Sequence, residues 1–395
     1  MKPILRFSEF ENDWEKDKLN NLGDFTSGGT PLKSNLDYWN GDIPWITTGD
    51  IANLRKENIN NFITEKALEE SSAKLIENRA ILIAMYGQGR TRGMSAILNF
   101  NAATNQACAI FQTDFDINFV YYFFQKSYKY IRSLSNDGSQ KNLSLNLLKE
   151  IQLNYPSKME QNKIGEFFSK LDRQIELEEE KLELLEQQKK GYMQKIFSQE
   201  LRFKDENGND YPTWKKTTIK EVAKLTVGKS KKNENTGKYI IMDMGTVTKN
   251  GTMLTHKSTP HENDLLNKGD LVMPKDDIGG GHIIGKTVFI PESQKYVLGD
   301  HVYRLETKKC NGLFLHFYIN SDIVNRSLKR KVTGSAQLGL NRKSVEEELV
   351  KVPCLEEQEK IGAFFSKLDT FIEKQLSKIE LLKERKKGFL QKMFV

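Results

Sequence analysis

Two stretches of the chain carry the same pattern of apolar and polar positions. Apolar residues recur at spacings of three and four from Ile164 to Ile196, and again from Ile361 to Met393. Such spacing, kept up over more than four heptads, is typical of a coiled-coil seam. Neither stretch contains proline, and good helix formers fill the other positions. The pattern predicts two long helices, each about 55 Å long at about 1.5 Å per residue.

The two stretches are copies of one another. Glu160–Phe197 and Glu357–Phe394 are identical at 23 of 38 positions, without a gap and at a constant offset of 197 residues. The tripeptide Leu-Arg-Phe also occurs twice, at 5–7 and 201–203. A chain of 395 residues that repeats at half its length predicts a duplicated fold, in which both halves do the same kind of work.

The segments between the helices predict mixed α+β bodies. Short apolar runs bounded by Gly, Asn and Asp are typical of strands. Each body then has one aromatic-rich helix, at 118–133 and 313–331, and closes with a strand-like run and a proline. The predicted strands are 43–46, 80–86, 96–100 and 106–112 in the first body, and 238–244, 270–273, 283–290 and 302–305 in the second. We therefore place bodies at 1–156 and 199–353, and helical spacers at 157–198 and 354–395.

The seams predict that the two helices pair with each other in antiparallel orientation. Polar residues interrupt them at Glu178 and Lys189, and at Gln375 and Lys386. Pairing centred near 182–185 would set Glu178 opposite Lys386 and Lys189 opposite Gln375, and polar pairs of this kind set the register of coiled coils. The first helix has nine acidic and seven basic residues and the second has six and nine, so their charges are complementary. The apolar pairing residues are Phe168, Leu171, Ile175, Leu182 and Leu185 in the first helix, and Phe365, Leu368, Ile372, Ile379 and Leu382 in the second.

Motifs for catalysis are absent or lack their structural context. Residues 280–287 satisfy the phosphate-binding pattern GxxxxGK[ST], but a β-branched run ending in Pro291 follows where that motif needs a helix. We therefore reject ATP binding. The glycines at 87 and 89 lack the context of a dinucleotide site, and no GxSxG elbow occurs. The five histidines all lie in the second body without ligand spacing, so we expect no catalysis and no metal site.

Composition bears on the binding partners and the cellular compartment of the protein. Net charge is +7, a mild excess that is compatible with nucleic acid. The three cysteines are isolated and frame neither a disulfide set nor a zinc site, which predicts a reducing cytoplasm. The longest apolar run, at 80–86, is too short to cross a bilayer, and the first residues have no apolar signal core. We expect a cytoplasmic protein without a membrane partner.

Polar loops are the best candidates for binding. Arg and Lys can pair with guanine and Asn and Gln with adenine, and Ser, Thr and backbone amides typically hold phosphates. The second body opens with a basic stretch, residues 215–260, which contains ten lysines and three acidic residues. The candidate DNA-binding residues of the first body are Thr30, Lys33, Thr47, Thr48, Tyr86, Gln88, Arg90, Arg92, Asn105, Gln140 and Lys141. Those of the second body are Lys229, Lys231, Lys232, Lys275, Lys286 and Gln337.

The chain resembles the DNA-specificity subunits of type I restriction–modification systems. Trp39 with the run GDIPWI at 41–46, GDI at 49–51 and TNQAC at 104–108 carry the resemblance, together with the duplicated EQxKIGxFFSKLDxxI. The second body departs from the pattern, because KYIIM at 238–242 replaces the PWI segment and no NQAC follows.

The resemblance implies a fold, and it assigns DNA recognition and catalysis to different subunits. The fold would be α+β, with two target recognition domains joined by two long antiparallel coiled-coil helices in pseudo-twofold symmetry. Each domain would read one half of a split site on double-stranded DNA, and two methylation subunits and further restriction subunits would bind. S-adenosylmethionine, ATP and Mg would belong to those partners, and this chain would not be an enzyme. The alternatives are a single-chain DNA methyltransferase or nuclease, which would need a cofactor motif, and a coiled-coil adaptor that binds no DNA.

Overall fold

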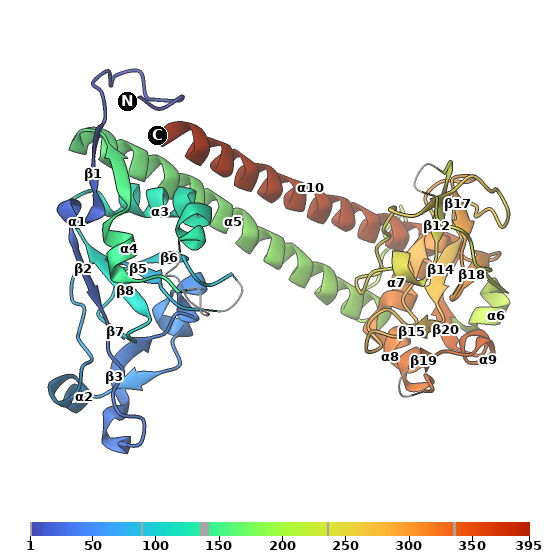
Figure 1. The fold of residues 1–395 in the computed structure, drawn as a ribbon. Helices are drawn as coiled ribbons and strands as arrows, with labels where there is room; N and C mark the ends of the chain where they lie inside the picture. Colours follow the sequence, from blue (N-terminus) through green and yellow to red (C-terminus); the bar gives the residue numbers. More distant parts are fainter. Residues whose placement is uncertain (1, 88–89, 135–141, 235–236, 335–336) are drawn as a thin grey trace. The chain divides into compact units, whose positions relative to one another are not determined.

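The apolar runs of the first body form two small sheets in the computed structural model (Figure 1). The structure describes residues 2–87, 90–134, 142–234, 237–334 and 337–395. One sheet is antiparallel and has the order β2(Asp24–Ser27)-β8(Cys108–Gln112)-β5(Ala80–Ala84)-β6(Ser95–Leu98). The other has the order β4(Phe62–Ile63)-β3(Trp39–Ile46)-β7(Ala103–Thr104), and its β3 and β7 run parallel. All five residues of β5 are buried, which is why this run is continuously apolar.

The second body repeats this topology strand for strand. Its antiparallel sheet has the order β11(Ala223–Val227)-β18(Val302–Thr307)-β14(Leu271–Pro274)-β16(Val288–Phe289). Its second sheet has the order β13(Ser258–Thr259)-β12(Tyr239–Met242)-β17(Tyr296–Leu298), in which β12 and β17 run parallel. The expectation of a duplicated α+β fold is confirmed, and KYIIM at 238–242 takes the place of the PWI segment in the sheet.

The bodies differ in their strands and in their aromatic-rich helix. Within the described residues, a pair formed by β15(Asp276–Asp277) and β19(Leu338–Gly339) occurs in the second body and has no counterpart in the first. The aromatic-rich helix is the single α3(Ile117–Ser133) in the first body, but it is divided into α7(Gly312–Asn320) and α8(Asp322–Arg330) in the second. The prediction of one helix over 313–331 is therefore wrong. Ser321 breaks it, since its backbone is extended and its buried hydroxyl donates to the carbonyl of Tyr318 at 2.6 Å.

Short elements complete each body. A two-stranded antiparallel ladder closes each one, β1(Glu15–Lys18) with β9(Gln152–Tyr155) and β10(Lys215–Thr218) with β20(Leu349–Val352). The short helices of the first body are α1(Leu19–Leu22), η1(Leu36–Tyr38), η2(Asp50–Asn53), η3(Lys56–Asn58), α2(Glu65–Glu70) and α4(Leu145–Lys149). Those of the second are α6(Ile219–Val222), η4(Met244–Thr246) and α9(Arg342–Glu346).

The two long helices are α5(Lys158–Phe197) and α10(Leu355–Met393) (Figure 1). They begin within a few residues of the predicted ends of the bodies. Each helix contributes to both of the compact units into which the chain divides: unit 1, residues 1–179 with 377–395, and unit 2, residues 180–376. The core of unit 1 holds Phe168 of α5 and Phe394, just after α10, whereas the core of unit 2 holds Phe197 of α5 and Phe365 of α10. The helix ends are therefore parts of the cores as well as of the spacers.

The orientation of the helix pair within each unit is antiparallel, but the predicted register is wrong. In unit 1, Lys386 pairs with Asp172 at 2.6 Å, and Glu178 pairs with Lys378. In unit 2, Lys189 pairs with Asp369. Lys386 and Lys189 each meet a residue six positions before the predicted partner. A heptad seam repeats every seven residues, so the seam alone allows more than one register. The register is selected by the packing of the helix ends into the two cores.

The predicted seam is the buried face of both helices. Ile175, Ile379 and Leu382 are buried, and so is the polar Gln375. The other pairing residues, Leu171, Leu182, Leu185, Leu368 and Ile372, are half-buried. Phe168 and Phe365 are fully buried in the cores of units 1 and 2.

Charge reversal at Lys386 should loosen the pairing in unit 1. Lys386 lies beside Asp172 and 5.3 Å from the ring centroid of Tyr122, whose hydroxyl donates to Asp172 at 2.8 Å. Lys386→Glu would place two carboxylates together and remove the cation–π contact, so we expect a loss of about 1–2 kcal/mol in unfolding free energy. Urea denaturation measures it, with the exposed neighbour Lys387→Glu as control. Equal stability of both variants would contradict the observed register.

Candidate functional site

Loops from four parts of the first body meet at one edge. Because β3 and β7 run parallel, their carboxyl ends lie side by side, and the amide of Asn105 donates to the carbonyl of Ile46 at 3.0 Å. Met85, after β5, joins them: its amide donates to Ala107 at 2.9 Å, and its carbonyl accepts from Leu143 at 3.0 Å. We call the described residues 47–50, 85–87, 90–92, 105–107 and 142–143 loop cluster 1.

The second body builds the same edge with the same backbone hydrogen bonds. The amide of Gly299 donates to Met242 at 2.8 Å, as Asn105 does to Ile46. The amide of Lys275 donates to His301 at 3.0 Å, and its carbonyl accepts from Leu340 at 2.7 Å. We call the described residues 243–246, 275–287, 299–301 and 337–340 loop cluster 2. The two clusters therefore share one backbone frame and carry different side chains.

Glycines bring one more loop to each edge. A side chain at Gly28 would collide with Thr104, and one at Gly228 would collide with the carbonyl of Gly299. These positions allow the backbone after β2 and after β11 to approach the parallel strand pair closely. Thr30 and Lys229 follow these glycines, so both candidates lie next to the clusters.

Loop cluster 1 holds several predicted residues in fixed positions. The amide and hydroxyl of Thr47 both donate to Asp50 Oδ2 at 2.7 Å, so Asp50 of the GDI motif orders this turn. Asn105 Oδ1 accepts from the amide of Ala107 at 3.1 Å, and the hydroxyl of Thr30 donates to Gln106. Thr48 adjoins Thr47 and is half-buried.

The remaining predicted residues of the first body divide into four groups. Tyr86 and Arg90 belong to the cluster and are exposed, Tyr86 by 42%. Arg92 instead turns to α3, where its Nη2 donates to the carbonyl of Arg132 at 3.1 Å and so favours the helix C-terminus. Lys33 lies apart in an exposed loop. Gln88, Gln140 and Lys141 lie outside the described residues.

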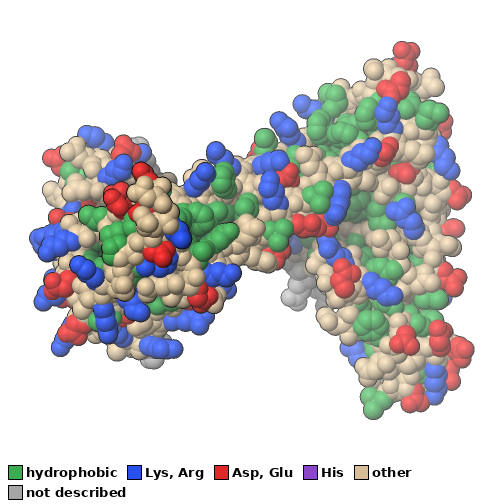
Figure 2. Space-filling model, turned by 180° about the vertical axis from the view of Figure 1, so that it is seen from behind, with side chains coloured by type: hydrophobic (Ala, Val, Ile, Leu, Met, Phe, Trp, Pro, Cys, Tyr) green, Lys and Arg blue, Asp and Glu red, His purple; other side chains and the backbone are tan. Residues whose placement is uncertain are grey.

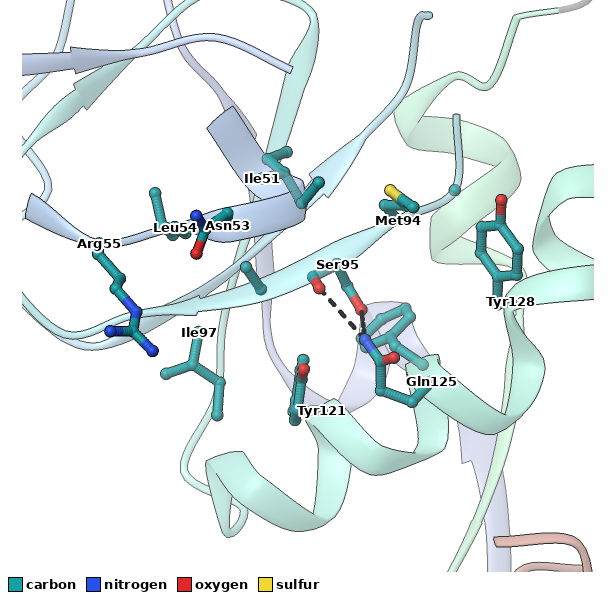
Figure 3. Close-up of a pocket in the computed structure, with 14 residues that line it drawn as sticks. Ile51, Asn53, Leu54, Arg55, Met94, Ser95, Ile97, Tyr121, Gln125 and Tyr128 are labelled. Atoms are coloured by element: carbon teal, nitrogen blue, oxygen red, sulfur yellow. Dashed lines mark hydrogen bonds between the residues drawn. The ribbon is translucent and has the colours of Figure 1, made fainter. Parts of the chain in front are cut away.

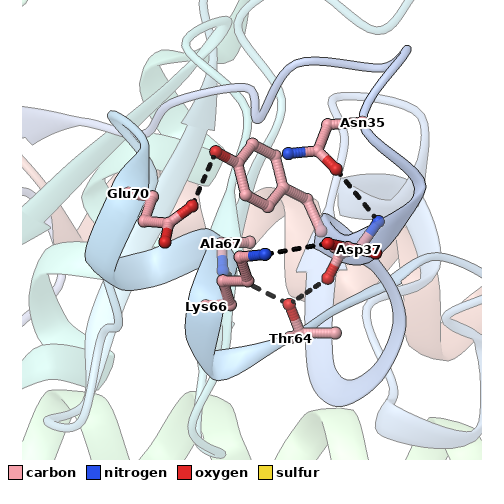
Figure 4. A network of polar contacts seen from close by, with 7 residues as sticks. Asn35, Asp37, Thr64, Lys66, Ala67 and Glu70 are labelled. Carbon is pink, nitrogen blue, oxygen red and sulfur yellow. Dashed lines mark hydrogen bonds and ion pairs between the residues drawn. The ribbon is translucent and has the colours of Figure 1, made fainter.

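A polar network fixes the loop that carries Lys33 to α2 (Figure 4). The side chain of Asn35 caps η1 by accepting from the amide of Asp37 at 3.2 Å. Lys66 Nζ donates to Asp37 Oδ2 at 2.8 Å, and Thr64 Oγ1 donates to the carbonyl of Asp37 at 2.8 Å. The loop therefore has a defined path although its side chains are exposed.

At least three of the ten lysines in the basic stretch of the second body form ion pairs, among them Lys257 with Asp243 at 2.6 Å. Lys231 Nζ pairs with Asp264 at 2.7 Å and its side chain is only 9% exposed, whereas Lys232 pairs with Glu234 at 3.4 Å and is exposed. Lys229 is exposed. On the face drawn in Figure 2, basic side chains are interspersed with acidic ones in both units. The sequence count of ten lysines therefore overstates the charge available to a ligand.

Loop cluster 2 places its three predicted residues differently. Lys275 lies at the centre of the cluster. Gln337 is exposed beside Leu338, which pairs with Asp277 across β15 and β19. Lys286 turns inward and donates to the carbonyl of Asn320 at the end of α7 at 3.2 Å, and burial lowers its pKa. It repeats at α7 the helix-capping contact that Arg92 makes at α3.

Sequence reasoning missed two residues of loop cluster 2. Asp276 Oδ2 accepts from His301 Nδ1 at 2.7 Å and from Lys275 Nζ at 3.1 Å. No ligand spacing in the sequence marks His301, one of the five histidines of the second body. The antiparallel pairing of β14 with β18 brings this group together, and the backbone hydrogen bond between Lys275 and His301, which are 26 positions apart, continues that pairing.

The buried titratable groups are structural. His316 lies inside unit 2, where its Nδ1 is 3.1 Å from the hydroxyl of Thr287. Burial, with nearby Lys189 and Lys286, lowers the pKa of His316 to about 3, so it stays neutral. Burial likewise raises the pKa of the Cys108 and Cys310 thiols to about 12, which keeps them protonated and unreactive.

The former phosphate-binding candidate is a loop that leads into a strand. The side chain of Asp277 accepts from the amides of Gly279 and Ile283 at 2.6 and 2.9 Å, and β16 follows at Val288. The loop therefore leads into a strand, as predicted, and not into the helix that a phosphate-binding motif needs. Among the described residues, no three His, Cys, Asp or Glu side chains are grouped to hold a metal ion. No helix in the described part of the chain is both long and apolar enough to cross a membrane.

Unit 1 also contains a cavity of about 510 Å³ between η2, β6 and α3 (Figure 3). Apolar groups such as Leu54, Ile97 and Tyr121 line it. Gln125 Nε2 donates to the carbonyl and the hydroxyl of Ser95 at 3.2 Å each, and Arg55 at its border pairs with Glu176 of α5 at 2.6 Å. Gln125 and Ser95 thus satisfy one another within the lining, while Arg55 is paired with a residue outside it.

Comparison with known proteins supports the duplication of the chain. The sequence profile of the type I restriction modification DNA specificity domain matches residues 11–187 and again 211–381. The MjaIX type I restriction enzyme specificity subunit of Methanocaldococcus jannaschii is 33% identical over 181 residues, which cover 44% of this chain and 41% of that protein. The EcoR124I/EcoR124II specificity subunit of Escherichia coli is 28% identical over 175 residues, 43% of each chain. Each match thus spans less than half of the relative's length.

Solved structures extend the similarity to the whole fold. The crystal structure of a type I restriction–modification S subunit from M. genitalium superposes with a TM-score of 0.63 at 18% identity. The superposition covers 100% of this chain and 99% of that one.

Proposed function

Because the chain belongs to the type I restriction modification DNA specificity domain family, we propose that each of its units reads one half of a bipartite DNA sequence. The observation that carries this proposal is the shared frame of loop clusters 1 and 2. The same three backbone hydrogen bonds recur, while the side chains that they present differ. A constant frame with variable polar side chains suits two readers of different base sequences.

The long helices would set the distance between the half-sites. α5 and α10 are each continuous and contribute residues to both units. Because their repeated segments are identical at 23 of 38 positions, the two helices give each unit a similar exposed helix surface. Two copies of a methylation subunit would bind these surfaces, one per unit, and restriction subunits would join that complex.

In this proposal the chain itself catalyses no reaction. The described histidine and cysteine environments favour structural roles, as given above. Transfer of a methyl group from S-adenosylmethionine to adenine would take place in the methylation subunits. Translocation and cleavage, which use ATP and Mg, would take place in the restriction subunits.

Exchange of one body tests the proposal. The chain is produced with methylation subunits, and modified adenines are mapped across the host genome; we expect one bipartite motif. Replacing residues 15–155 by the corresponding body of another family member should change one half of the motif and leave the other half and the spacing. As a control, the chain alone with labelled S-adenosylmethionine and DNA should incorporate no label. A motif changed in both halves, or in neither, would contradict the proposal.

A further inference from the structure

The shared frame identifies matching positions in the two loop clusters. Met85 and Lys275 make the same two backbone hydrogen bonds, to Ala107 and Leu143 in one unit and to His301 and Leu340 in the other. The residue after each of them therefore stands at the same place at the edge. In unit 1 this residue is Tyr86, and in unit 2 it is Asp276.

Asp276 is held in one orientation from two sides. His301 Nδ1 lies 2.7 Å and Lys275 Nζ 3.1 Å from its Oδ2, and its side chain is 16% exposed. Partial burial raises the pKa of Asp276, but the hydrogen bonds from His301 and Lys275 outweigh it and leave the pKa below its usual value. The group is therefore an ionised carboxylate at neutral pH.

His301 has an uncommon backbone conformation in this arrangement. Its φ of 58° lies in the left-handed region, which residues other than glycine adopt uncommonly, asparagine, aspartate and histidine being the most frequent of them. Ala107, at the matching position of unit 1, is not among the described residues with positive φ. Local strain of this kind persists where the surrounding structure enforces it, commonly at functional sites.

The charge of Asp276 restricts the part of DNA that it can face. A carboxylate repels phosphates, so the sugar–phosphate backbone is excluded as its partner. Lys275 and His301 offset its charge and allow it to approach DNA. In the major groove, the groups that donate to a carboxylate are the exocyclic amino groups of cytosine and adenine.

We propose that Asp276 determines the specificity of unit 2, its Oδ1 accepting a hydrogen bond from an exocyclic amino group of a base in that half-site. Lys275 and His301 are positioning residues that hold Oδ2. Tyr86 occupies the matching place in unit 1 and presents an aromatic hydroxyl. The two units would therefore contact different base groups from the same position of the shared backbone frame. This inference rests on the proposed function of the chain.

Substitution of Asp276 tests it in the assembled complex with methylation subunits. Asp276→Asn removes the charge and one acceptor at nearly the same size. We expect methylation of the original sites to fall about tenfold, and the half of the motif read by unit 2 to relax or change at one position. The half read by unit 1 and the spacing should stay the same. The matched control is Glu292→Gln, an exposed carboxylate that pairs with Lys295 at 3.0 Å and precedes β17, away from loop cluster 2.

His301 variants separate positioning from folding. His301→Gly keeps the left-handed backbone but removes the donor, whereas His301→Asn keeps both the backbone preference and a donor. The glycine variant should lose recognition at the same motif position as Asp276→Asn, and the asparagine variant should restore it. Equal loss in both variants would show that His301 does not act through its hydrogen bond to Asp276.

The outcomes distinguish this inference from the proposed function. If the wild-type complex gives no bipartite motif, the proposed function is wrong. If it does, and Asp276→Asn leaves both halves of the motif and the methylation rate unchanged, the role of Asp276 alone is wrong. Thermal unfolding checks that each variant is folded, and Asp276→Ser replaces Asp276→Asn in the comparison if the latter does not assemble.

Discussion

Replacing Arg202 by alanine should destabilise unit 2 by about 3 kcal/mol or more. Arg202 forms a two-pronged ion pair with Glu357, from Nε at 3.1 Å and Nη2 at 2.6 Å. Glu357 is fully buried in the first turn of α10 and also accepts from Trp214 Nε1 at 3.2 Å. Without Arg202 the buried carboxylate loses its counter-charge, and the attachment of the chain after α5 to α10 is lost with it. Charge-assisted, bidentate pairs of this kind are the strong ones.

The measurement has to resolve the two units. Hydrogen–deuterium exchange of peptides from residues 214–227 should rise strongly in Arg202→Ala, while peptides from unit 1 stay protected. Lys204→Ala is the control, because its pair with Asp210 is exposed and 3.9 Å long; we expect less than about 0.5 kcal/mol for it. The repeat supplies a second test: Arg6 makes the same pair with the buried Glu160 at 2.7 and 2.8 Å, so Arg6→Ala should destabilise unit 1 instead. Uniform loss of protection across both units would contradict the local role of these pairs.

Phe394→Ala should cost unit 1 about 3–5 kcal/mol, although the residue is next to the end of the chain. Its ring stacks on Phe119 at 5.2 Å and lies 6.0 Å from Phe168 and 6.4 Å from Trp14, and it is only 4% exposed. Truncation would leave a cavity between α3, α5 and the end of α10. Because this packing anchors α10, the pairing of Lys386 with Asp172 should weaken as well.

Tryptophan fluorescence during urea unfolding reports this loss, since three of the four tryptophans, Trp14, Trp39 and Trp45, lie in unit 1. The control is Leu381→Ala on α10, whose side chain is 47% exposed. Phe197→Ala is the equivalent change in unit 2, where the ring stacks on Tyr318 at 4.9 Å and Phe365 at 5.6 Å. A Phe394→Ala protein as stable as the Leu381→Ala control would show that α10 is held in register by the seam alone.

These repeated anchors explain how two bodies with different loop side chains use one architecture. The ion pairs of Arg6 and Arg202 and the aromatic contacts of Phe394 and Phe197 fix each body to the same helices. The loops at the edge of each body carry none of these contacts. Side chains such as Tyr86 and Asp276 can therefore differ between the units without changing the frame that presents them.

The family motifs acquire physical explanations in the structure. Asp50 of the GDI motif orders the turn at Thr47, and Asn105 of TNQAC caps the turn to Ala107. Both residues serve the frame of loop cluster 1. The second body keeps the frame with other residues, since Gly299 and Met242 make the hydrogen bond of Asn105 and Ile46. This is why the motifs could be absent there while the topology is the same.

The sequence by itself determined the duplication, the α+β class of both bodies, the two long helices with their buried seam and the strand that follows residues 280–287. These features are local or periodic, and a pattern of apolar positions is enough to specify them. Only the tertiary structure decided the register of α5 against α10, because a heptad seam allows pairings seven residues apart and the packing of Phe394 and Phe197 selects one. It also decided which loop residues meet: antiparallel pairing of β14 with β18 brings Asp276 to His301, while Arg92 and Lys286 turn to helix ends. Contacts between distant residues depend on the strand order of the sheets, which no spacing in the sequence encodes.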